Sequence, residues 1–362
     1  MKQLSGTRLS LESEFEDSLK GRRVLITGSR GFIGAHLARA LVGLGAFVVG
    51  SARSWSAETP PGRANPRKSL VRRASEFSDG ASTPSASPAS ASAPTGLIPL
   101  ECDLCDFAAT RQMLWTSQPE IIFHLAATVT ARESLDLVQP TLNNIVAASV
   151  NLMNAAAEAR CKLIVTCATS EQPADDSPPV SPYAAAKECV STYCQLFRHK
   201  FGLEIREVMP FLTFGPGQDE AKLIPHIITS LLFGVSPKLS DATRTFDLVY
   251  IDDVVRGIIM TALHPEAIAQ PVELGSGAAI TVTEIVQRIV RLIESDMTDS
   301  FRRLIEPDMT ATFDSSDKRT SPAGRVADLS HSLDTTGWLP IWTLDEALQE
   351  TIAWYHQRCK DG

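Results

Sequence analysis

The sequence predicts an α/β protein: a doubly wound parallel sheet followed by a smaller, mixed α/β lobe at the C-terminal end. Short aliphatic runs alternate with amphipathic stretches from residue 23 onward, and this alternation is typical of βαβ units. A glycine-rich turn joins the first aliphatic run directly to the first amphipathic stretch. With 362 residues and 44% hydrophobic content, the chain is large enough to bury such a core.

Six or seven parallel strands are predicted. Six of them correspond to the aliphatic runs 23–27, 47–50, 97–100, 121–125, 162–166 and 203–209. The intervening helices are expected near 32–44, 106–116, 140–159 and 182–201. The lobe is expected to hold helices near 221–233, 252–263, 281–294 and 343–358. We therefore divide the chain into a tail at 1–21, a sheet domain at 22–211 and a lobe at 212–362, with the elements of the two partly interleaved.

Two stretches break this rhythm. Residues 54–96 are rich in Ser, Ala and Pro and poor in large apolar side chains, so we expect a disordered insertion there. Residues 306–323 are irregular and are expected to form a surface loop. The first stretch follows the second strand, where folds of this type usually recognise an adenosine ribose.

Composition excludes several classes of function. A net charge of −8 gives no clustered positive charge for phosphates, so nucleic-acid partners are not expected. Apolar runs stop short of the roughly 20 residues of a membrane-spanning helix, and the N-terminus lacks an apolar signal core, so we expect no membrane partner and a cytoplasmic location. The seven cysteines lack paired metal spacing, so neither a metal site nor a disulfide framework is predicted; the Cys102/Cys105 pair is interpreted as incidental.

The turn after the first strand has the spacing GxxGxxG. Its glycines permit a tight turn, a close backbone approach to a pyrophosphate and close packing of the following helix, whose N-terminus supplies N–H donors. The turn therefore predicts a dinucleotide site that comprises Gly28, Ser29, Arg30, Gly31, Phe32, Ile33 and Gly34.

Later strand ends agree with this prediction. Asp103 and Leu104 follow the third strand, where a carboxylate and a backbone amide can meet an adenine edge. The fourth strand ends in residues that let a flat cofactor lie against the sheet, namely Leu125, Ala126 and Ala127. His124 is interpreted as a hydrogen-bonded core histidine without a catalytic role.

The second strand ends without an acidic residue. A carboxylate there would bind the ribose 2′-hydroxyl, whereas Ser51 and Arg53 can hold a 2′-phosphate through charge-assisted hydrogen bonds. This favours NADP over NAD. The alternative is that Arg53 is simply the first solvated residue of the insertion.

A second motif indicates proton-transfer chemistry. Tyr183 and Lys187 are four residues apart on a predicted helix, so their side chains share a face, and an ammonium beside a phenol lowers the phenol pKa. A strand end one loop upstream offers a hydroxyl for a substrate oxygen, with Thr169 preferred over Ser170. Glu171 follows and is interpreted either as a base for a carbon-bound proton or as a solvated carboxylate.

Taken together, these motifs resemble the extended short-chain dehydrogenase/reductase family of nucleotide-sugar epimerases, dehydratases and reductases. The resemblance covers residues 22 to 357 outside the two irregular stretches and includes TGSRGFIG, HLAA, YAAAK, FGPGQ, VYIDDVV and ELGSG. It implies a Rossmann domain with NAD or NADP, a Ser/Thr–Tyr–Lys group on Thr169, Tyr183 and Lys187, and commonly a homodimer. We also expect Pro210 to contact the cofactor and Thr128 to contact the substrate.

The chain departs from the family pattern at three places. Gln172 and Pro173 replace the usual tyrosine and glycine after the hydroxyl residue. Leu212 replaces an asparagine that contacts the substrate diphosphate in many relatives. The arginine expected before VYIDD is Phe246, but Arg244 lies two positions earlier, on the same face of a strand, from which it can still reach a phosphate.

Three functions remain open. The first is an NAD(P)-dependent epimerase or dehydratase that acts on a nucleotide-linked sugar through a keto intermediate. The second is an NADPH-dependent reductase of a keto-sugar or another carbonyl compound. The third, from a different class, is a cofactor-binding sensor without catalysis, which is disfavoured because both Tyr183 and Lys187 are present.

Overall fold

The computed structural model describes residues 11–55, 96–129, 133–171, 178–239, 241–266, 270–296, 312–313 and 324–361. Two compact units are distinguished: the first contains residues up to Trp55, Ala91–Met209 and Val255–Val272, and the second contains Pro210–Val254 and the chain from Glu273 onward. One later segment, Val255–Val272, therefore belongs to the first unit. Most of the predicted insertion at 54–96 and of the loop at 306–323 lies outside the described residues.

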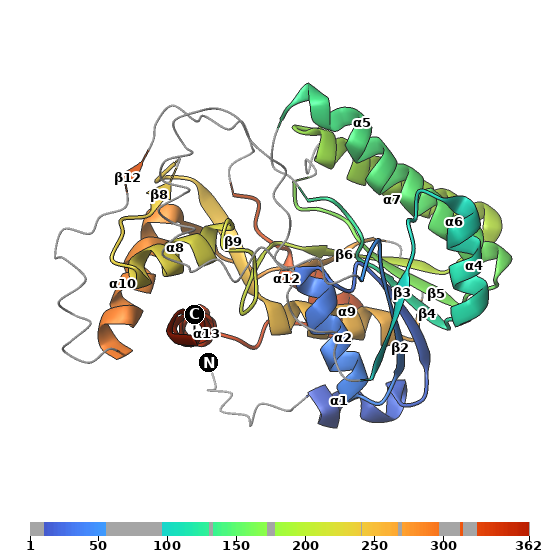
Figure 1. Cartoon of the computed structure of the whole chain (residues 1–362), viewed down its shortest axis with the longest axis horizontal. Helices are drawn as coiled ribbons and strands as arrows, with labels where there is room; N and C mark the ends of the chain where they lie inside the picture. Colours follow the sequence, from blue (N-terminus) through green and yellow to red (C-terminus); the bar gives the residue numbers. More distant parts are fainter. Residues whose placement is uncertain are drawn as a thin grey trace. The chain divides into compact units, whose positions relative to one another are not determined.

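The first unit is built on a seven-stranded sheet (Figure 1). Its strand order is β10 (Val272–Leu274), β6 (Ile205–Pro210), β5 (Leu163–Cys167), β4 (Ile121–His124), β1 (Arg23–Thr27), β2 (Phe47–Ala52) and β3 (Leu97–Glu101). Neighbouring strands from β6 to β3 pair in parallel. Since β1 lies between β2 and β4, the strand order reverses there, and crevices for ligands form at such switch points. The predicted Rossmann-type sheet is confirmed.

Helices cover both faces of this sheet, as Figure 1 shows, because strands buried on both faces need apolar cover on each side. They comprise α2 (Phe32–Gly43), α4 (Phe107–Ser117), α6 (Ala148–Glu158), α7 (Pro182–Phe201) and α9 (Ile251–Leu263). The helix predicted near 140–159 is present as continuous helical backbone made of α5 (Val138–Thr141), a π-helical segment at Leu142–Ala147 and α6, and a 3₁₀ turn, η1 (Leu135–Leu137), precedes it. In the part of the chain that is described, no helix is both long and apolar enough to cross a membrane.

The expectation of a tail at 1–21 is wrong for its second half. Residues Leu11–Leu19 form helix α1, which buries Phe15 and Leu19. Glu14 on this helix forms an ion pair with Arg256 at 3.1 Å. The segment LESEFEDSL therefore forms an amphipathic helix in which Phe15 and Leu19 are removed from water, which stabilises it.

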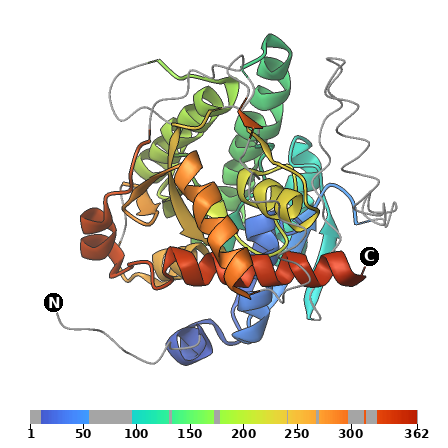
Figure 2. The ribbon, with the colours of Figure 1, turned by 90° about the vertical axis from the view of Figure 1, so that its left-hand side faces the viewer.

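The second unit contains two small sheets. The first has the order β11 (Ala279–Thr281), β9 (Thr245–Tyr250), β7 (Leu212–Phe214), and the second pairs β12 (Thr312–Phe313) with β8 (Lys238–Leu239). Around them lie α8 (Leu223–Leu232), α10 (Val282–Asp296), α12 (Leu329–Thr336) and α13 (Leu344–Asp361), and Figure 2 shows α10 crossing α13. The buried carboxylate of Asp247 accepts hydrogen bonds from the backbone N–H groups of Ser276, Gly277 and Ala327, which fixes two loops to β9.

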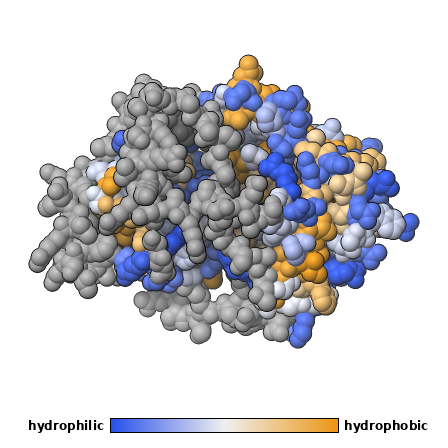
Figure 3. Space-filling model, in the orientation of Figure 1, coloured by the Kyte–Doolittle hydropathy of each residue, from blue (hydrophilic) through white to orange (hydrophobic). Residues whose placement is uncertain are grey.

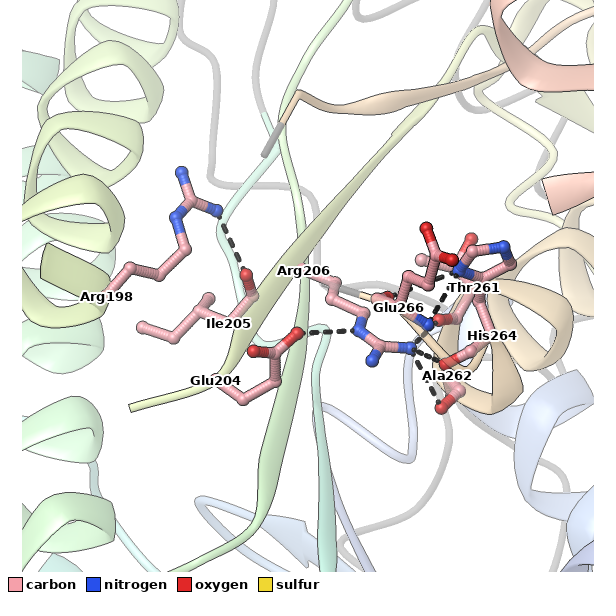
Figure 4. Close-up of polar contacts among 8 residues, drawn as sticks. All are labelled: Arg198, Glu204, Ile205, Arg206, Thr261, Ala262, His264 and Glu266. Atoms are coloured by element: carbon pink, nitrogen blue, oxygen red, sulfur yellow. Dashed lines mark hydrogen bonds and ion pairs between the residues drawn. The ribbon is translucent and has the colours of Figure 1, made fainter. Parts of the chain in front are cut away.

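A buried arginine joins β6 to the end of α9 (Figure 4). The Arg206 guanidinium donates to the carbonyl oxygens of Thr261 and His264, each at 2.7 Å, and to that of Ala262 at 3.3 Å. Its Nε donates to Glu204 at 3.0 Å. The last carbonyls of a helix have no partner within the helix, so this side chain satisfies groups that burial would otherwise leave unpaired.

We predict that Arg206→Ala lowers the free energy of unfolding by about 2–4 kcal/mol, because it leaves several buried carbonyls without donors. Arg111→Ala is the matched control: Arg111 pairs with Glu158 at 2.8 Å, but both side chains are about half exposed, and such a pair is worth at most about 1 kcal/mol. Urea denaturation of both variants measures the difference. Equal losses would contradict the capping role of Arg206.

Candidate active site

The glycine turn lies at the carboxyl end of β1 and is shaped by two close approaches. Gly28 has a φ of +72°, and a Cβ at this position would lie 2.8 Å from the backbone N and Cα of Ala126. A Cβ at Gly34 would lie 2.2 Å from the carbonyl oxygen of Gly28. Since real Cβ atoms do not approach backbone so closely, both positions require glycine. Between β1 and α2, the loop can therefore lie directly against the backbone of Ala126.

The N-terminus of α2 faces this loop without a side-chain cap. The N-cap residue is Gly31, which has no side chain that could cap the helix, and the first helical turn contains no acidic residue. The loop is hydrogen-bonded to β2, because the carbonyl oxygen of Ser51 accepts from Gly28 N at 3.0 Å and from Ser29 Oγ at 3.3 Å. Backbone donors and the helix dipole at such a terminus suit an anion, so the loop fits the pyrophosphate of a dinucleotide.

The side chain of His124 is hydrogen-bonded to β1 and to α6. Its Nδ1 lies 2.7 Å from Thr27 Oγ1 and its Nε2 lies 2.9 Å from Ser149 Oγ, so both ring nitrogens have partners. Burial, followed by the charge of Lys187, lowers the His124 pKa to about 3, which keeps the ring neutral. Thr27 Oγ1 also accepts from Ala126 N at 3.3 Å. The interpretation of a hydrogen-bonded core histidine is confirmed.

The other candidate cofactor residues occupy different environments. Ser51 is buried beneath the glycine loop, whereas Arg53 is exposed. Asp103 accepts a hydrogen bond from the backbone N of Cys105, and Leu104 is buried with its carbonyl bonded to Asn151. Phe32 and Ile33 open α2, and Leu125 to Ala127 follow β4.

Trp55 lies close to the glycine loop, which local sequence does not predict. This residue follows β2 at the start of the insertion, where the low-complexity composition hides it. The Arg30 guanidinium lies 5.7 Å from the centre of its ring.

The CxxC pair is not a reactive centre. Burial raises the pKa values of the Cys102 and Cys105 thiols, whereas a reactive thiol needs a lowered pKa. Cys105 also donates through Sγ to the carbonyl oxygen of Asn143 at 3.3 Å. Both cysteines are free, in agreement with their interpretation as incidental.

Helix α7 positions the predicted proton-transfer pair. Its N-cap Ser181 accepts from the backbone N of Ala184 at 3.0 Å, and Pro182 occupies the first turn, where its missing N–H has no cost. One turn apart on this helix, Tyr183 and Lys187 are both buried. The Lys187 Nζ lies 5.9 Å from the centre of the Tyr183 ring and donates to the carbonyl oxygen of Cys167 at 2.7 Å.

Thr169 follows β5 and is near enough to Tyr183 for its hydroxyl to influence the phenol pKa. Burial raises the Tyr183 pKa, the charges of Cys167 and Glu171 raise it further, and the Thr169 hydroxyl acts in the opposite direction. Burial also lowers the pKa of Lys187. The predicted lowering of the phenol pKa is therefore not found in the protein alone, because the Tyr183 pKa is raised and burial is the largest cause.

The remaining residues of the loop after β5 lie close to the phenol. Glu171 contributes its charge to the Tyr183 pKa, and its backbone N donates to Thr169 Oγ1 at 3.3 Å. Ser170 is half-buried beside it, and the predicted departures Gln172 and Pro173 lie outside the described residues. Two groups went unnoticed in the sequence: Cys167, whose carbonyl holds Lys187, and Glu207, a buried carboxylate on β6 that raises the Lys187 pKa.

The candidate substrate residues lie on several elements. Thr128 is exposed after β4 in the first unit. In the second unit, Leu212 pairs with Leu248 on β9, and Pro210 ends β6. Arg244 directly precedes β9, and its guanidinium lies 4.9 Å from the centre of the Phe246 ring. The two side chains therefore share a face, as predicted.

A dinucleotide loop in the same unit as a buried hydroxyl, phenol and ammonium defines a class of protein: an α/β enzyme for redox chemistry at an alcohol or carbonyl carbon. The chain belongs to the NAD-dependent epimerase/dehydratase family, whose model matches residues 24–275. This confirms the resemblance to the extended short-chain dehydrogenase/reductases.

Relatives cover nearly the whole chain. It is 28% identical to a UDP-glucose 4-epimerase of Mycolicibacterium smegmatis over 93% of this chain and 99% of that protein. It is 25% identical to a dTDP-glucose 4,6-dehydratase of Streptomyces griseus over 92% and 94%. The fold is similar to that of a UDP-glucose 4-epimerase of Thermotoga maritima solved with UDP-glucose, with a TM-score of 0.72, 20% identity, and coverage of 92% of this chain and 99% of that one.

We predict that Gly34→Ala weakens the binding of a nicotinamide dinucleotide by about tenfold or more, because its Cβ collides with the backbone of Gly28. Gly31→Ala is the graded control, since its Cβ would meet the same carbonyl oxygen at 3.1 Å, where a small shift relieves the contact. Titration calorimetry compares the two. If both variants bind as the unmodified protein does, the close approach is not what shapes the loop.

Proposed function

We propose that this protein is an NAD(P)-dependent epimerase or dehydratase of a nucleotide-linked sugar. The observation that carries the proposal is that the Lys187 ammonium lies beside the phenol of Tyr183, with Nζ 5.9 Å from the ring centre, and that the Thr169 hydroxyl is near enough to influence the phenol pKa. These three groups are buried, so proton transfer among them is shielded from water. The retention of both Tyr183 and Lys187 in this arrangement disfavours a sensor without catalysis.

Each group has a role in the proposed mechanism. A bound nicotinamide cofactor supplies reversible hydride exchange with the sugar carbon. Tyr183 takes the proton from the substrate hydroxyl, while Thr169 donates a hydrogen bond to the same oxygen. Lys187 holds a positive charge beside the phenol, which favours the phenolate that accepts this proton. The substrate passes through a ketone, which acidifies the neighbouring C–H bond.

Glu171 distinguishes the two reactions within this proposal. A dehydratase needs a base for the carbon-bound proton next to the ketone, and Glu171 is close enough to Tyr183 to influence its pKa. Ser170 is the second hydroxyl candidate on the same loop. If the protein is a dehydratase, Glu171→Gln abolishes dehydration but leaves reversible oxidation of the sugar, whereas an epimerase retains full activity.

The substrate class is inferred from relatives and from the second unit. The curated relatives act on UDP- and dTDP-linked sugars, as their names state. We propose that Arg244 binds a phosphate of such a substrate in place of the usual arginine, with Leu212 beside the nucleotide. The guanidinium of Arg244, stacked on Phe246, presents its N–H donors at the edge of a fixed plane.

A keto-sugar reductase that consumes NADPH is the second candidate. One observation favours it: β2 ends in Ser51 and Ala52 and is followed by Arg53, so the strand end offers no carboxylate for a ribose 2′-hydroxyl. The same feature supports NADP as the cofactor. Mass spectrometry of the cofactor that is released from the purified protein separates the candidates, since a closed cycle favours tight retention and a reductase exchanges its cofactor at each turnover.

We propose that the protein forms a homodimer through helices of the first unit. The π-helical segment packs against α7. The exposed apolar side chains on these and adjoining elements include Leu135, Val138, Leu142, Tyr193 and Leu196. Figure 3 shows apolar atoms at the top of the molecule, where Figure 1 places α5. Such clustering is typical of an interface.

Light scattering tests the dimer. We expect Leu142→Glu combined with Leu196→Glu to halve the molar mass in solution, because two buried charges would oppose association. Leu339→Glu, an exposed leucine in the second unit, is the control. A monomeric unmodified protein would contradict the proposal.

For the chemistry, we predict that Tyr183→Phe lowers turnover of a UDP- or dTDP-hexose by about 10²–10⁴-fold while cofactor binding is retained, because proton transfer is lost. Thr169→Val is expected to lose about 10²-fold through the missing hydrogen bond to the substrate oxygen. Tyr193→Phe, which alters a half-exposed tyrosine on the same helix, is the matched control. Full activity of Tyr183→Phe would rule out the proposed mechanism.

A further inference from the structure

A row of buried polar side chains crosses the face of the large sheet that α6 and α7 cover. In the register of the parallel strands, His124 on β4 pairs with Thr27 on β1 and with Thr166 on β5. Thr166 in turn pairs with Glu207 on β6. Because residues paired in this way project from the same face of a sheet, the four side chains form one line. All four are buried, and the line ends on β6 in a carboxylate.

Glu207 is held from α7 at both of its carboxylate oxygens. Ser191 Oγ donates to one oxygen at 2.6 Å, and a guanidinium N–H of Arg198 donates to the other at 3.5 Å. Arg198 also donates to the carbonyl oxygen of Ile205 at 3.0 Å, as Figure 4 shows. These bonds replace the water that the carboxylate loses on burial, and they fix the place of its charge.

Lys187 lies on the same face of α7 as Ser191, since the two residues are one helical turn apart. Its ammonium is bonded to the carbonyl oxygen of Cys167 on β5, the strand next to β6. Cys167 pairs in register with Val208, which directly follows Glu207. The ammonium and the carboxylate are thus held at adjacent strand ends under one helix.

The charge of Glu207 acts on Lys187 without competition from the neighbouring thiols. Burial lowers the Lys187 pKa, and three groups act in the opposite direction: Cys167, Cys194 and Glu207. Burial raises the pKa of Cys167 to about 11 and raises that of Cys194 as well. Both thiols are therefore uncharged near neutral pH, so neither compensates the ammonium.

Three other titratable groups surround the pair. His124 is neutral, because burial and then the charge of Lys187 lower its pKa to about 3. Burial raises the pKa of Tyr183, and the charge of Glu171 raises it further. Within the described residues, Glu207 is the carboxylate whose charge acts on Lys187.

We propose that Glu207 is a positioning residue for the proton transfer: held by Ser191 and Arg198, its carboxylate keeps the buried Lys187 ammonium charged. Through Lys187 it favours the phenolate of Tyr183. This inference rests on the proposed function, because it concerns the same proton transfer. The charge of Lys187 can nevertheless be measured without any substrate.

The test is an NMR titration of the full chain, isotope-labelled at the lysine Cε carbons, whose shifts report the charge of each ammonium. The signal that is missing from Lys187→Met identifies Lys187. In Glu207→Gln, burial is no longer opposed, so Lys187 should lose its proton at a pH lower by about one unit or more. Glu188→Gln is the matched control: the same change at the neighbouring, exposed position of α7 should shift the midpoint by less than about 0.3.

The direction of the shift separates an electrostatic role from a loss of structure. Disturbed packing would admit water and raise the Lys187 midpoint, whereas the lost carboxylate lowers it. Glu207→Asp, which keeps the charge, should restore most of the midpoint. Arg198→Gln removes a cation from beside the carboxylate and should raise the midpoint, which gives a second test if Glu207→Gln does not fold.

The pH profile of turnover of a UDP- or dTDP-hexose extends the test. In Glu207→Gln, kcat should fall at a lower pH on the alkaline side, in step with the Lys187 midpoint, while KM changes by less than about threefold. An unchanged midpoint in Glu207→Gln, or a Lys187 that stays charged over the whole folded range in both proteins, would overturn the proposal. Absence of turnover with every hexose would contradict the proposed function, but the NMR titration would still decide the role of Glu207.

Discussion

The hydrogen bond from the Lys187 ammonium to the carbonyl oxygen of Cys167 is the interaction on which the candidate active site depends. It connects α7 to the carboxyl end of β5, with 2.7 Å between the Lys187 Nζ and the carbonyl oxygen of Cys167. It also replaces part of the hydration that the ammonium loses on burial. Because Tyr183 is one turn away on the same helix, this bond also fixes the phenol near Thr169, two residues beyond Cys167. The groups proposed for proton transfer and for substrate binding thus share one anchor.

The second constraint is the close approach of backbone segments at the end of β1. With glycine at positions 28 and 34, the loop lies against Ala126 and α2 begins directly behind it. The open N-terminus of α2 can then meet a pyrophosphate, and Arg30 projects toward Trp55 and the end of β2.

Burial around Tyr183 raises its pKa in the protein alone, so the proposed chemistry requires added positive charge or ligand contacts to favour the phenolate.

The fold and the centre of the site could be predicted because local sequence carries them. The strands at 23–27 and 121–124 are continuous aliphatic runs, and the pair Tyr183 and Lys187 needs only helical spacing. Helix α1 was missed because it is short and precedes the first strand. Trp55 and Cys167 were missed for another reason: their roles depend on partners 45 and 20 residues away in the chain, Leu100 and Lys187. Contacts of this kind have no local pattern.

In the proposed mechanism, the protein oxidises and reduces the sugar within one closed cycle. The most direct test is to incubate it, with its retained cofactor, with UDP- or dTDP-glucose that is fully deuterated on the hexose carbons, and to follow the label by mass spectrometry. We expect the deuterium of the oxidised carbon to be found in the sugar product, with none in free NADPH or NADH. Deuterium in released cofactor, together with net accumulation of an oxidised sugar, would contradict the account.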